Sequence, residues 1–120
     1  MLFARDKGTE VETAVCQYLQ KQGLKLLSRN YHSRGGEIDL IMLHEKVLVF
    51  IEVRFRRTAA FGSAAETVTR RKQARIIQTA EQYLQRHRLA HESCRFDVVA
   101  VSPAGNDYQI QWIQNAFEQG

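Results

Sequence analysis

Apolar residues recur along the chain at two spacings, and these spacings predict alternating helices and strands. Between residues 6 and 22 they recur every three or four positions, the period of one helical face, and Gly23 follows where a helix often ends. A second stripe of this kind predicts a helix that begins after Thr69, as its N-cap, and runs to about Arg88.

Runs rich in β-branched and aromatic residues lie between and after the two helices, which predicts strands. The expected strands cover residues 24–31, 37–43, 47–53, 95–102 and 108–112. The last of them alternates apolar with polar side chains, as an edge strand with one solvated face does. We expect a loop at residues 54–66, around Phe61-Gly62-Ser63, and a short tail from residue 115 onward. The predicted order of elements is therefore α-β-β-β-α-β-β.

The two strands of the predicted hairpin, residues 37–43 and 47–53, carry apolar side chains on both faces. Ile38 and Leu40 point to one face and Ile41 to the other, and the second strand shows the same pattern. A strand that is apolar on both sides is typical of a central strand covered from both sides. The sequence therefore predicts an α/β fold in which helices flank the sheet.

The composition places the chain among ordinary globular proteins. Its 120 residues are 44% hydrophobic and 25% charged, which suits one domain spanning residues 1–120 and excludes a disordered or fibrous chain. Its longest apolar run, residues 47–51, is far below the roughly 18 residues that a membrane span needs. The N-terminus lacks the long apolar stretch of a signal peptide, so we expect a cytoplasmic protein.

Metal-binding patterns built from cysteine and histidine are absent from the sequence. Cys16 and Cys94 lie far apart, without the paired spacing of a zinc site, and we expect both to be small buried apolar residues. The four histidines show no ligand spacing either. A zinc site is therefore not expected.

Positive charge concentrates in one part of a nearly balanced chain, whose net charge is +4. Seven arginines and lysines fall between residues 54 and 75, against one glutamate. Six of the seven are arginine, whose planar guanidinium matches the oxygen atoms of a phosphate. Such a segment favours a polyanionic partner over a merely solvated surface. We expect nucleic-acid contacts from Arg34, Arg56, Arg57, Arg70, Arg71, Lys72 and Arg75.

Two carboxylates interrupt the apolar hairpin. Asp39 lies in the first strand and Glu52 in the second, and a carboxylate in a buried strand is costly unless it is paired or holds a metal ion. A two-residue turn at Glu45-Lys46, or a four-residue turn, would place the acids directly opposite each other on one face. The same register would set Arg54 opposite Glu37, whereas a three-residue turn would put the two acids on opposite faces. We predict the register that brings the acids together.

Two adjacent carboxylates can bind Mg²⁺ or Mn²⁺ through their oxygen atoms while the ion keeps several waters. Such an ion lowers the pKa of a bound water and neutralises charge that develops on a phosphate. Arg54, two residues after Glu52, would share the face and hold the scissile phosphate. The alternative is a structural ion network in which Arg54 pairs with Glu52 or Glu37 and another arginine pairs with the aspartate. The spacing leaves both interpretations open.

Asp39 followed by Glu52-Val53-Arg54 resembles the PD-(D/E)XK nuclease signature, in which an Asp and a Glu-x-Lys lie on the two strands of a hairpin. Over nearly its whole length, the sequence also resembles the YraN family, a bacterial family of predicted endonuclease-like proteins distantly related to Holliday-junction resolvases. The matching segments are Gly36-Glu37-Ile38-Asp39-Leu40-Ile41, Val49-Phe50-Ile51-Glu52-Val53-Arg54, Phe61-Gly62, Lys72 and Arg95-Phe96-Asp97-Val98-Val99.

The resemblance implies a restriction-endonuclease-like core, a mixed sheet flanked by helices, which agrees with the predicted order of elements. It also implies an acid in the first helix. Glu10, just after Gly8, takes that place as an additional metal ligand or as a partner of a metal-bound water. The alternative for Glu10 is an exposed acid that the helix dipole favours near the helix N-terminus.

Arg54 departs from the nuclease signature, which has lysine at this position. Arginine does not lose its proton in proteins, whereas lysine can. Arg54 would therefore stabilise charge on the reacting phosphate, and a metal-activated water or Lys72 would have to serve as base. For Lys72 we favour a solvated cation in the first turn of the second helix, although cations there oppose the helix dipole.

Together these features predict a Mg²⁺- or Mn²⁺-dependent endonuclease acting on DNA, and the resolvase kinship adds branched DNA as a substrate. The catalytic residues would be Asp39, Glu52, Arg54 and Glu10, of which the three acids would bind the metal. Symmetric cutting of a junction would require a homodimer. The alternative, which Arg54 favours, is a nucleic-acid-binding module that keeps the fold without catalysis. A third interpretation is a protein-interaction domain with a structural ion cluster.

Overall fold

The computed structural model describes residues 4–57, 64–89 and 92–118, and its elements follow the predicted order. Their bounds are α1 (Ala4–Lys21), β1 (Lys25–Ser33), β2 (Gly36–His44), β3 (Val47–Phe55), the 3-10 helix η1 (Ala64–Thr67), α2 (Arg70–Arg86), β4 (Cys94–Ala104) and β5 (Asp107–Phe117). The predicted loop centre, Phe61-Gly62-Ser63, lies outside the described residues. In the described part of that loop, η1 forms a helical turn that the sequence pattern did not predict.

The five strands form one mixed sheet in the order β1-β2-β3-β4-β5. Strands β3 and β4, which α2 connects, pair in parallel, whereas the other neighbours pair antiparallel. A parallel pair needs a long crossover connection, and a helix commonly supplies it. The α/β class, the mixed sheet and the edge position of β5 are therefore confirmed.

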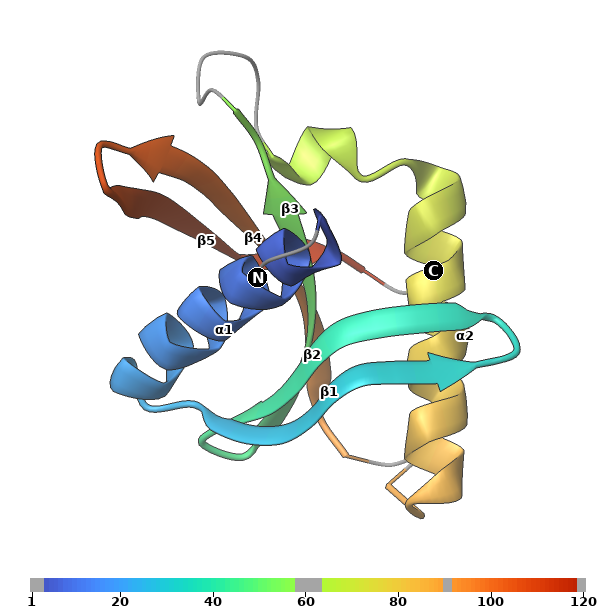
Figure 1. Ribbon diagram of the computed structural model, residues 1–120. Helices are drawn as coiled ribbons and strands as arrows, with labels where there is room; N and C mark the ends of the chain where they lie inside the picture. The colour runs from blue at the N-terminus through green and yellow to red at the C-terminus, as the bar shows by residue number, and fades with distance from the viewer. Residues whose placement is uncertain (1–3, 58–63, 90–91, 119–120) are drawn as a thin grey trace.

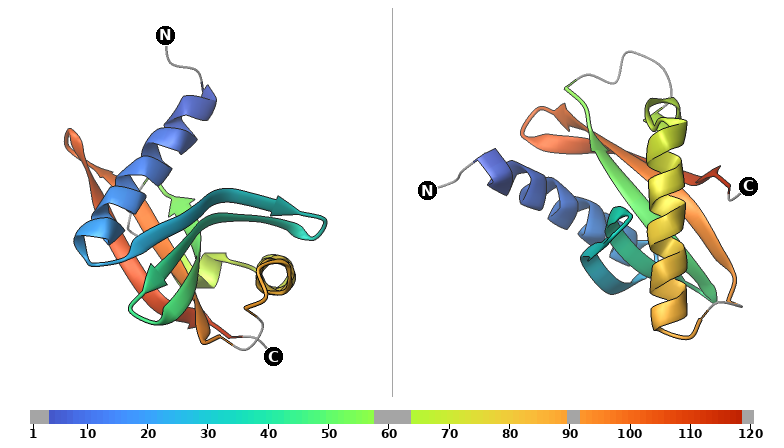
Figure 2. Two further views of the ribbon diagram at one scale, coloured as in Figure 1. Left: turned by 90° about the horizontal axis from the view of Figure 1, so that it is seen from below. Right: turned by 90° about the vertical axis from the view of Figure 1, so that its right-hand side faces the viewer.

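Helices α1 and α2 cover opposite faces of the sheet, as Figure 1 and Figure 2 show. The core on the α1 side includes Val15, Leu19, Leu40, Met42 and Val49. The core on the α2 side includes Ile41, Phe50, Ile76, Ala80 and Tyr83. Because both faces of β2 and β3 are buried, the prediction of a central pair covered from both sides is confirmed.

The register of the β2–β3 hairpin is the predicted one. A two-residue turn, Glu45-Lys46, joins the strands, and Glu45 takes a left-handed conformation with φ 57°. The ladder between the strands ends with Leu40 opposite Ile51. The next positions along the two strands are Asp39 and Glu52, which the same register sets opposite each other.

Strands β2 and β3 separate beyond the pair of Leu40 and Ile51. As Figure 1 shows, β2 stays with β1 and curls toward α2, while β3 continues along β4 to Phe55. The opening between residues 36–39 of β2 and residues 52–55 of β3 is called the fork below. Because the strands diverge, the expectation that Arg54 stands opposite Glu37 is wrong. The Glu37 carboxylate instead lies 2.7 Å from His32 Nε2 on β1.

The curl of β2 also changes the face of one apolar residue. Strict alternation predicts that Ile38 and Leu40 share a face, but Ile38 packs in the core on the α2 side. Its partner on β1, Tyr31, makes an edge-to-face ring contact with Tyr83 of α2. The tip of the β1–β2 hairpin therefore packs against α2.

The ends of two elements show where sequence signals succeed and fail. Thr69 caps α2 as predicted, and its hydroxyl accepts a hydrogen bond from the Lys72 N–H at 3.1 Å. The tail expected from residue 115 is wrong, because β5 continues to Phe117. Asn115 permits this continuation by taking φ 52° where the ladder with β4 shifts register.

Cys16 is buried in the core on the α1 side and Cys94 is partly buried, and both are free thiols. In the described ranges, no helix is long and apolar enough to cross a membrane.

Candidate active site

Glu52 is a carboxylate in a strand whose neighbouring side chains are almost all apolar. It lies in β3 with 5% of its surface exposed, and strand alternation places it on the same face as Phe50, which packs toward α2. Burial raises the pKa of Glu52 to about 7, and the nearby charge of Asp39 contributes to the rise. A carboxyl group with such a pKa can hold a proton or exchange it for a cation near neutral pH.

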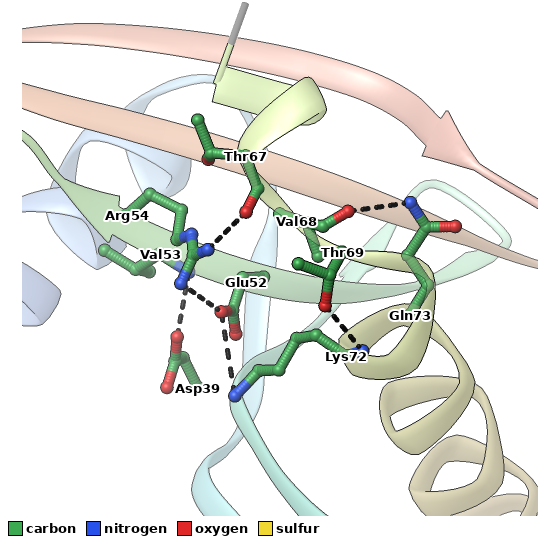
Figure 3. Close-up of polar contacts among 9 residues, drawn as sticks. All are labelled: Asp39, Glu52, Val53, Arg54, Thr67, Val68, Thr69, Lys72 and Gln73. Atoms are coloured by element: carbon green, nitrogen blue, oxygen red, sulfur yellow. Dashed lines mark hydrogen bonds and ion pairs between the residues drawn. The ribbon is translucent and has the colours of Figure 1, made fainter.

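Asp39 meets Glu52 at the base of the fork, as the predicted register requires (Figure 3). Its Oδ2 atom accepts a hydrogen bond from the backbone N–H of Val53 at 2.8 Å. Burial raises the pKa of Asp39, whereas the hydrogen bonds from Val53 and from the Glu52 side chain lower it. The hydrogen bond between the two carboxyl groups raises the pKa of Glu52. Burial thus raises the pKa of both carboxyl groups, and a cation close to them favours their charged forms.

Two cations face the same oxygen atom of Glu52 (Figure 3). Lys72 Nζ lies 3.8 Å and Arg54 Nη1 lies 3.5 Å from Glu52 Oε2. Both distances exceed the roughly 2.7–3.2 Å of a protein N–H···O hydrogen bond, so these ion pairs are loose. Arg54 is held more firmly by Thr67, whose backbone carbonyl accepts a hydrogen bond from its Nη2 at 2.6 Å. The oxygen atoms of Glu52 thus keep capacity for another partner.

The first turn of α2 brings Lys72 to the pair. Thr69 caps the helix, which fixes the position of Lys72 three residues later. The Lys72 side chain is 37% exposed, and its charge lowers the pKa of both Asp39 and Glu52. The expectation of a merely solvated cation is therefore wrong, because Lys72 forms part of the site.

Glu12 is a further acid near the pair, and sequence reasoning missed it. Burial raises the pKa of Glu12, and the next largest cause is the negative charge of Asp39. Its Oε1 atom is buried and has no hydrogen-bond partner among the described residues, although Arg29 Nη2 lies 3.8 Å away. The sequence does contain a pattern that points to Glu12. This residue stands four positions before Cys16 and seven before Leu19, so it continues their buried helical stripe.

Glu10 does not join Asp39 and Glu52, although the family resemblance had implied an acid from this part of α1. Its Oε1 atom accepts a hydrogen bond of 2.6 Å from the hydroxyl of Tyr108 on β5, and its side chain is exposed. Two residues turn a helix by about 200°, so Glu10 and Glu12 cannot face the same way. The acid of α1 that the charge of Asp39 affects is Glu12, and the structure does not bring Glu10 to the pair.

The donor atoms of the pair suit a hard divalent cation. In the described part of the chain, no three side chains from His, Cys, Asp and Glu lie close enough to bind one ion together. Mg²⁺ does not need three, because it is commonly bound by one or two carboxylates and keeps several waters. Asp39 and Glu52 supply two carboxylates, and Glu12, whose Oε1 is buried, lies near enough to Asp39 to be affected by its charge.

The residues predicted to contact nucleic acid lie on three segments of the chain. Arg56 and Arg57 follow the end of β3, with Arg57 exposed. The exposed basic side chains on the first two turns of α2 are those of Arg70, Arg71 and Arg75. Arg34 is exposed at the tip of the β1–β2 hairpin, where the adjacent Gly35 packs closely on the Gln78 side chain of α2.

The sequence profile of the uncharacterised protein family UPF0102 matches residues 11–101, a span that contains Glu12, Asp39, Glu52, Arg54 and Lys72. This chain belongs to the UPF0102 family. A UPF0102 protein of Saccharophagus degradans is 55% identical over 113 residues, covering 93% of this chain and 92% of that protein. One from Nitrosococcus oceani is 51% identical over 114 residues, covering 94% and 92%.

A more distant UPF0102 protein, from Vibrio parahaemolyticus, is 45% identical over 117 residues and covers 97% of this chain and 95% of itself. Such alignments run through α1, the hairpin, α2 and the last two strands, so UPF0102 membership applies to the whole fold. The resemblance to the YraN family is thereby confirmed at the level of the family.

Proposed function

We propose that this UPF0102 protein is a divalent-metal-dependent endonuclease that hydrolyses phosphodiester bonds of DNA. The proposal rests on one observation: the partly buried Asp39 and the buried Glu52 converge at the base of the fork, where two cations face Glu52. Two converging carboxylates form a site where a divalent cation can bind in place of protons. The exposed arginines on α2 and beyond β3 support a polyanionic substrate.

Each side chain of the site has a distinct role in this proposal. Mg²⁺ or Mn²⁺ held by Asp39 and Glu52 would lower the pKa of a water and neutralise charge developing on the phosphate. The guanidinium of Arg54 is anchored by the Thr67 carbonyl and offers its remaining N–H groups to phosphate oxygens. Lys72 can release a proton, which arginine cannot, so it is the side chain suited to move one.

A second function, nucleic-acid binding without catalysis, is favoured by one specific observation. Arg54 stands where the nuclease signature has lysine, and its charge already lies 3.5 Å from Glu52. If the ion pairs of Arg54 and Lys72 with Glu52 complete the site, the same basic surface binds DNA but no bond is cut.

A cleavage assay separates the two functions. Labelled duplex, single-stranded and four-way-junction DNA would be incubated with the protein in Mg²⁺, Mn²⁺ or EDTA. We expect cleavage with metal only, at least 100-fold slower for Asp39→Asn and Glu52→Gln, while DNA affinity stays within about threefold. Glu45→Gln, at the other end of the same hairpin, is the matched control and should cleave normally. Paired, symmetric cuts in the junction would further support a homodimer.

Two results would overturn the proposal. Salt-sensitive DNA binding without cleavage of any substrate would select the binding module. Absence of DNA binding altogether, with a properly folded protein, would favour the third interpretation, in which the ion cluster is structural.

A further inference from the structure

A hollow of about 320 Å³ lies next to residues that contact the acid pair. It is lined by Val53, Arg54, Phe55 and Arg56 of the β3 segment and by Thr67. Two of these residues already belong to the site, because Val53 donates to Asp39 and Arg54 pairs with Glu52. The hollow exists because β3 has lost β2 as its neighbour at the fork. Its volume is near the lower end of the roughly 300–1,000 Å³ of small-ligand pockets, room for about one nucleotide and too little for a duplex.

Phe55 is an exposed aromatic residue at this hollow. Its exposed fraction is 39%, and the other large apolar side chains that are comparably exposed within the described residues are Leu26 and Leu27. Those two leucines lie on β1, away from the fork, whereas Phe55 lies in the hollow between two arginines in the sequence.

The surroundings of Phe55 hold its ring in place. The ring lies edge-to-face with that of Tyr108, at 6.5 Å between centroids and 90° between planes. Tyr108 is itself fixed by the hydrogen bond of its hydroxyl to Glu10. This gives a role to Glu10, which supports the aromatic pair rather than the acid pair. A positioned aromatic ring beside arginines is the arrangement that proteins use to stack unpaired bases and hold the adjoining phosphates.

We propose that Phe55 stacks on an unpaired base of the DNA strand whose phosphate reaches Asp39 and Glu52. The inference rests on the proposed function, because it places the same nucleic acid at the same site, and it names the substrate class. Bases within a continuous duplex stack on each other and cannot present a face to Phe55. The preferred substrate is therefore single-stranded DNA, or the unpaired part of a branched DNA. Arg56, on the other side of Phe55 from Arg54, contacts the next phosphate.

The test measures binding rather than cleavage. An oligonucleotide containing the fluorescent base analogue 2-aminopurine would be titrated with protein in EDTA, in single-stranded and in duplex form. We expect wild-type protein to quench the single-stranded probe. Phe55→Ala should weaken single-strand affinity by about tenfold or more and abolish the quenching, while changing duplex affinity by less than twofold. Phe55→Trp should restore both the affinity and the quenching.

Matched controls exclude simpler explanations of a loss. Leu27→Ala removes a similarly exposed apolar side chain from β1 and should leave binding to both probes unchanged. Circular dichroism and thermal unfolding would show that Phe55→Ala is folded, and Phe55→Tyr, which keeps the ring, should bind like the wild type. The inference is overturned if Phe55→Ala binds the single strand as tightly as the wild type, or loses single-strand and duplex affinity equally.

The same data distinguish this inference from the proposed function. If metal-dependent cleavage fails but Phe55→Ala still loses single-strand affinity, stacking stands and the nuclease proposal falls. If cleavage depends on Asp39 and Glu52 but Phe55→Ala binds normally, the nuclease proposal stands and stacking is wrong.

Discussion

The backbone N–H of Val53 donates a hydrogen bond to the Asp39 side chain at 2.8 Å, at the point where β2 and β3 stop pairing. In a continuing ladder, a backbone carbonyl of the neighbouring strand would accept such a bond. The Asp39 carboxylate therefore takes over the role of the missing strand and is itself positioned by the residue that follows Glu52. The end of the ladder and the geometry of the acid pair have the same origin.

Replacing Asp39 tests this hydrogen bond. Asp39→Ala removes the acceptor and leaves the Val53 N–H unsatisfied in a partly buried place, whereas Asp39→Asn keeps an oxygen that can accept the bond. Both variants remove the negative charge next to Glu52, so their difference isolates the hydrogen bond. We expect the alanine variant to have a free energy of unfolding about 1–3 kcal/mol below that of the asparagine variant, measured by urea denaturation. Equal stabilities would show that the bond contributes nothing.

The raised pKa of Glu52 makes the stability of the metal-free protein depend on pH. The pKa is about 7 in the folded protein, against an ordinary value of 4.5. Between these values the folded state holds a proton that the unfolded state has lost, so rising pH destabilises the fold. The stabilisation of the folded state by this proton is fully present below about pH 4.5 and is lost as the pH rises through about 7. We expect a loss of about 2–3 kcal/mol from pH 5 to pH 8, relative to Glu52→Gln under the same conditions.

Metal ions should act on the same group in the opposite direction. A divalent cation competes with the proton on Glu52, so it binds better as the pH rises. Mg²⁺ or Mn²⁺ should therefore raise the thermal unfolding temperature of the wild type more at pH 8 than at pH 6, and that of Glu52→Gln little at either pH. A metal-induced shift of the same size in both proteins would place the ion elsewhere.

The convergence of Asp39 and Glu52 could be predicted from the sequence because it depends on local rules. Side chains alternate along a strand, and the short turn at Glu45-Lys46 sets the register for the whole hairpin. The wrong expectation that Arg54 stands opposite Glu37 has a different origin. Whether β2 stays with β3 or leaves it depends on how the β1–β2 hairpin packs on α2, and no local pattern near residue 37 records that contact.

Replacing each of two acids of α1, Glu10 and Glu12, tests which of them supports metal binding. The charge of Asp39 affects Glu12, whereas Glu10 accepts a hydrogen bond from Tyr108. Acids next to a metal site but outside its direct ligands typically change metal affinity when replaced. We expect Glu12→Gln to weaken Mn²⁺ binding about tenfold by calorimetry, and Glu10→Gln to leave it unchanged. Equal losses in the two variants would restore Glu10 as a partner of the site.

The position of Glu10, away from the acid pair, shows what a motif alone leaves undetermined. A motif counted from Gly8 locates an acid to within a residue or two, but a helix turns by about 100° per residue. Only the buried stripe through Cys16 and Leu19 fixes which acid faces the sheet, and it selects Glu12. The ion pair between Lys72 and Glu52 was not favoured for a related reason, because no local sequence pattern records a contact between side chains of separate elements.

The arginines of α2 provide the last prediction, in which stability and DNA binding change in opposite directions. Arg71 is exposed in the first turn, which contains no acid, and its charge opposes the helix dipole, whereas Arg86 in the last turn is favoured by it. We expect Arg71→Ala to stabilise the protein by about 0.3–1 kcal/mol and Arg86→Ala to destabilise it by a similar amount. If Arg71 contacts a DNA phosphate, its replacement should also reduce the slope of log affinity against log salt by about 1, equally for single-stranded and duplex DNA. Arg86→Ala should leave that slope unchanged. An equal reduction of the slope in both variants would contradict the prediction, because DNA would then bind both ends of α2 without preference for the end that carries Lys72.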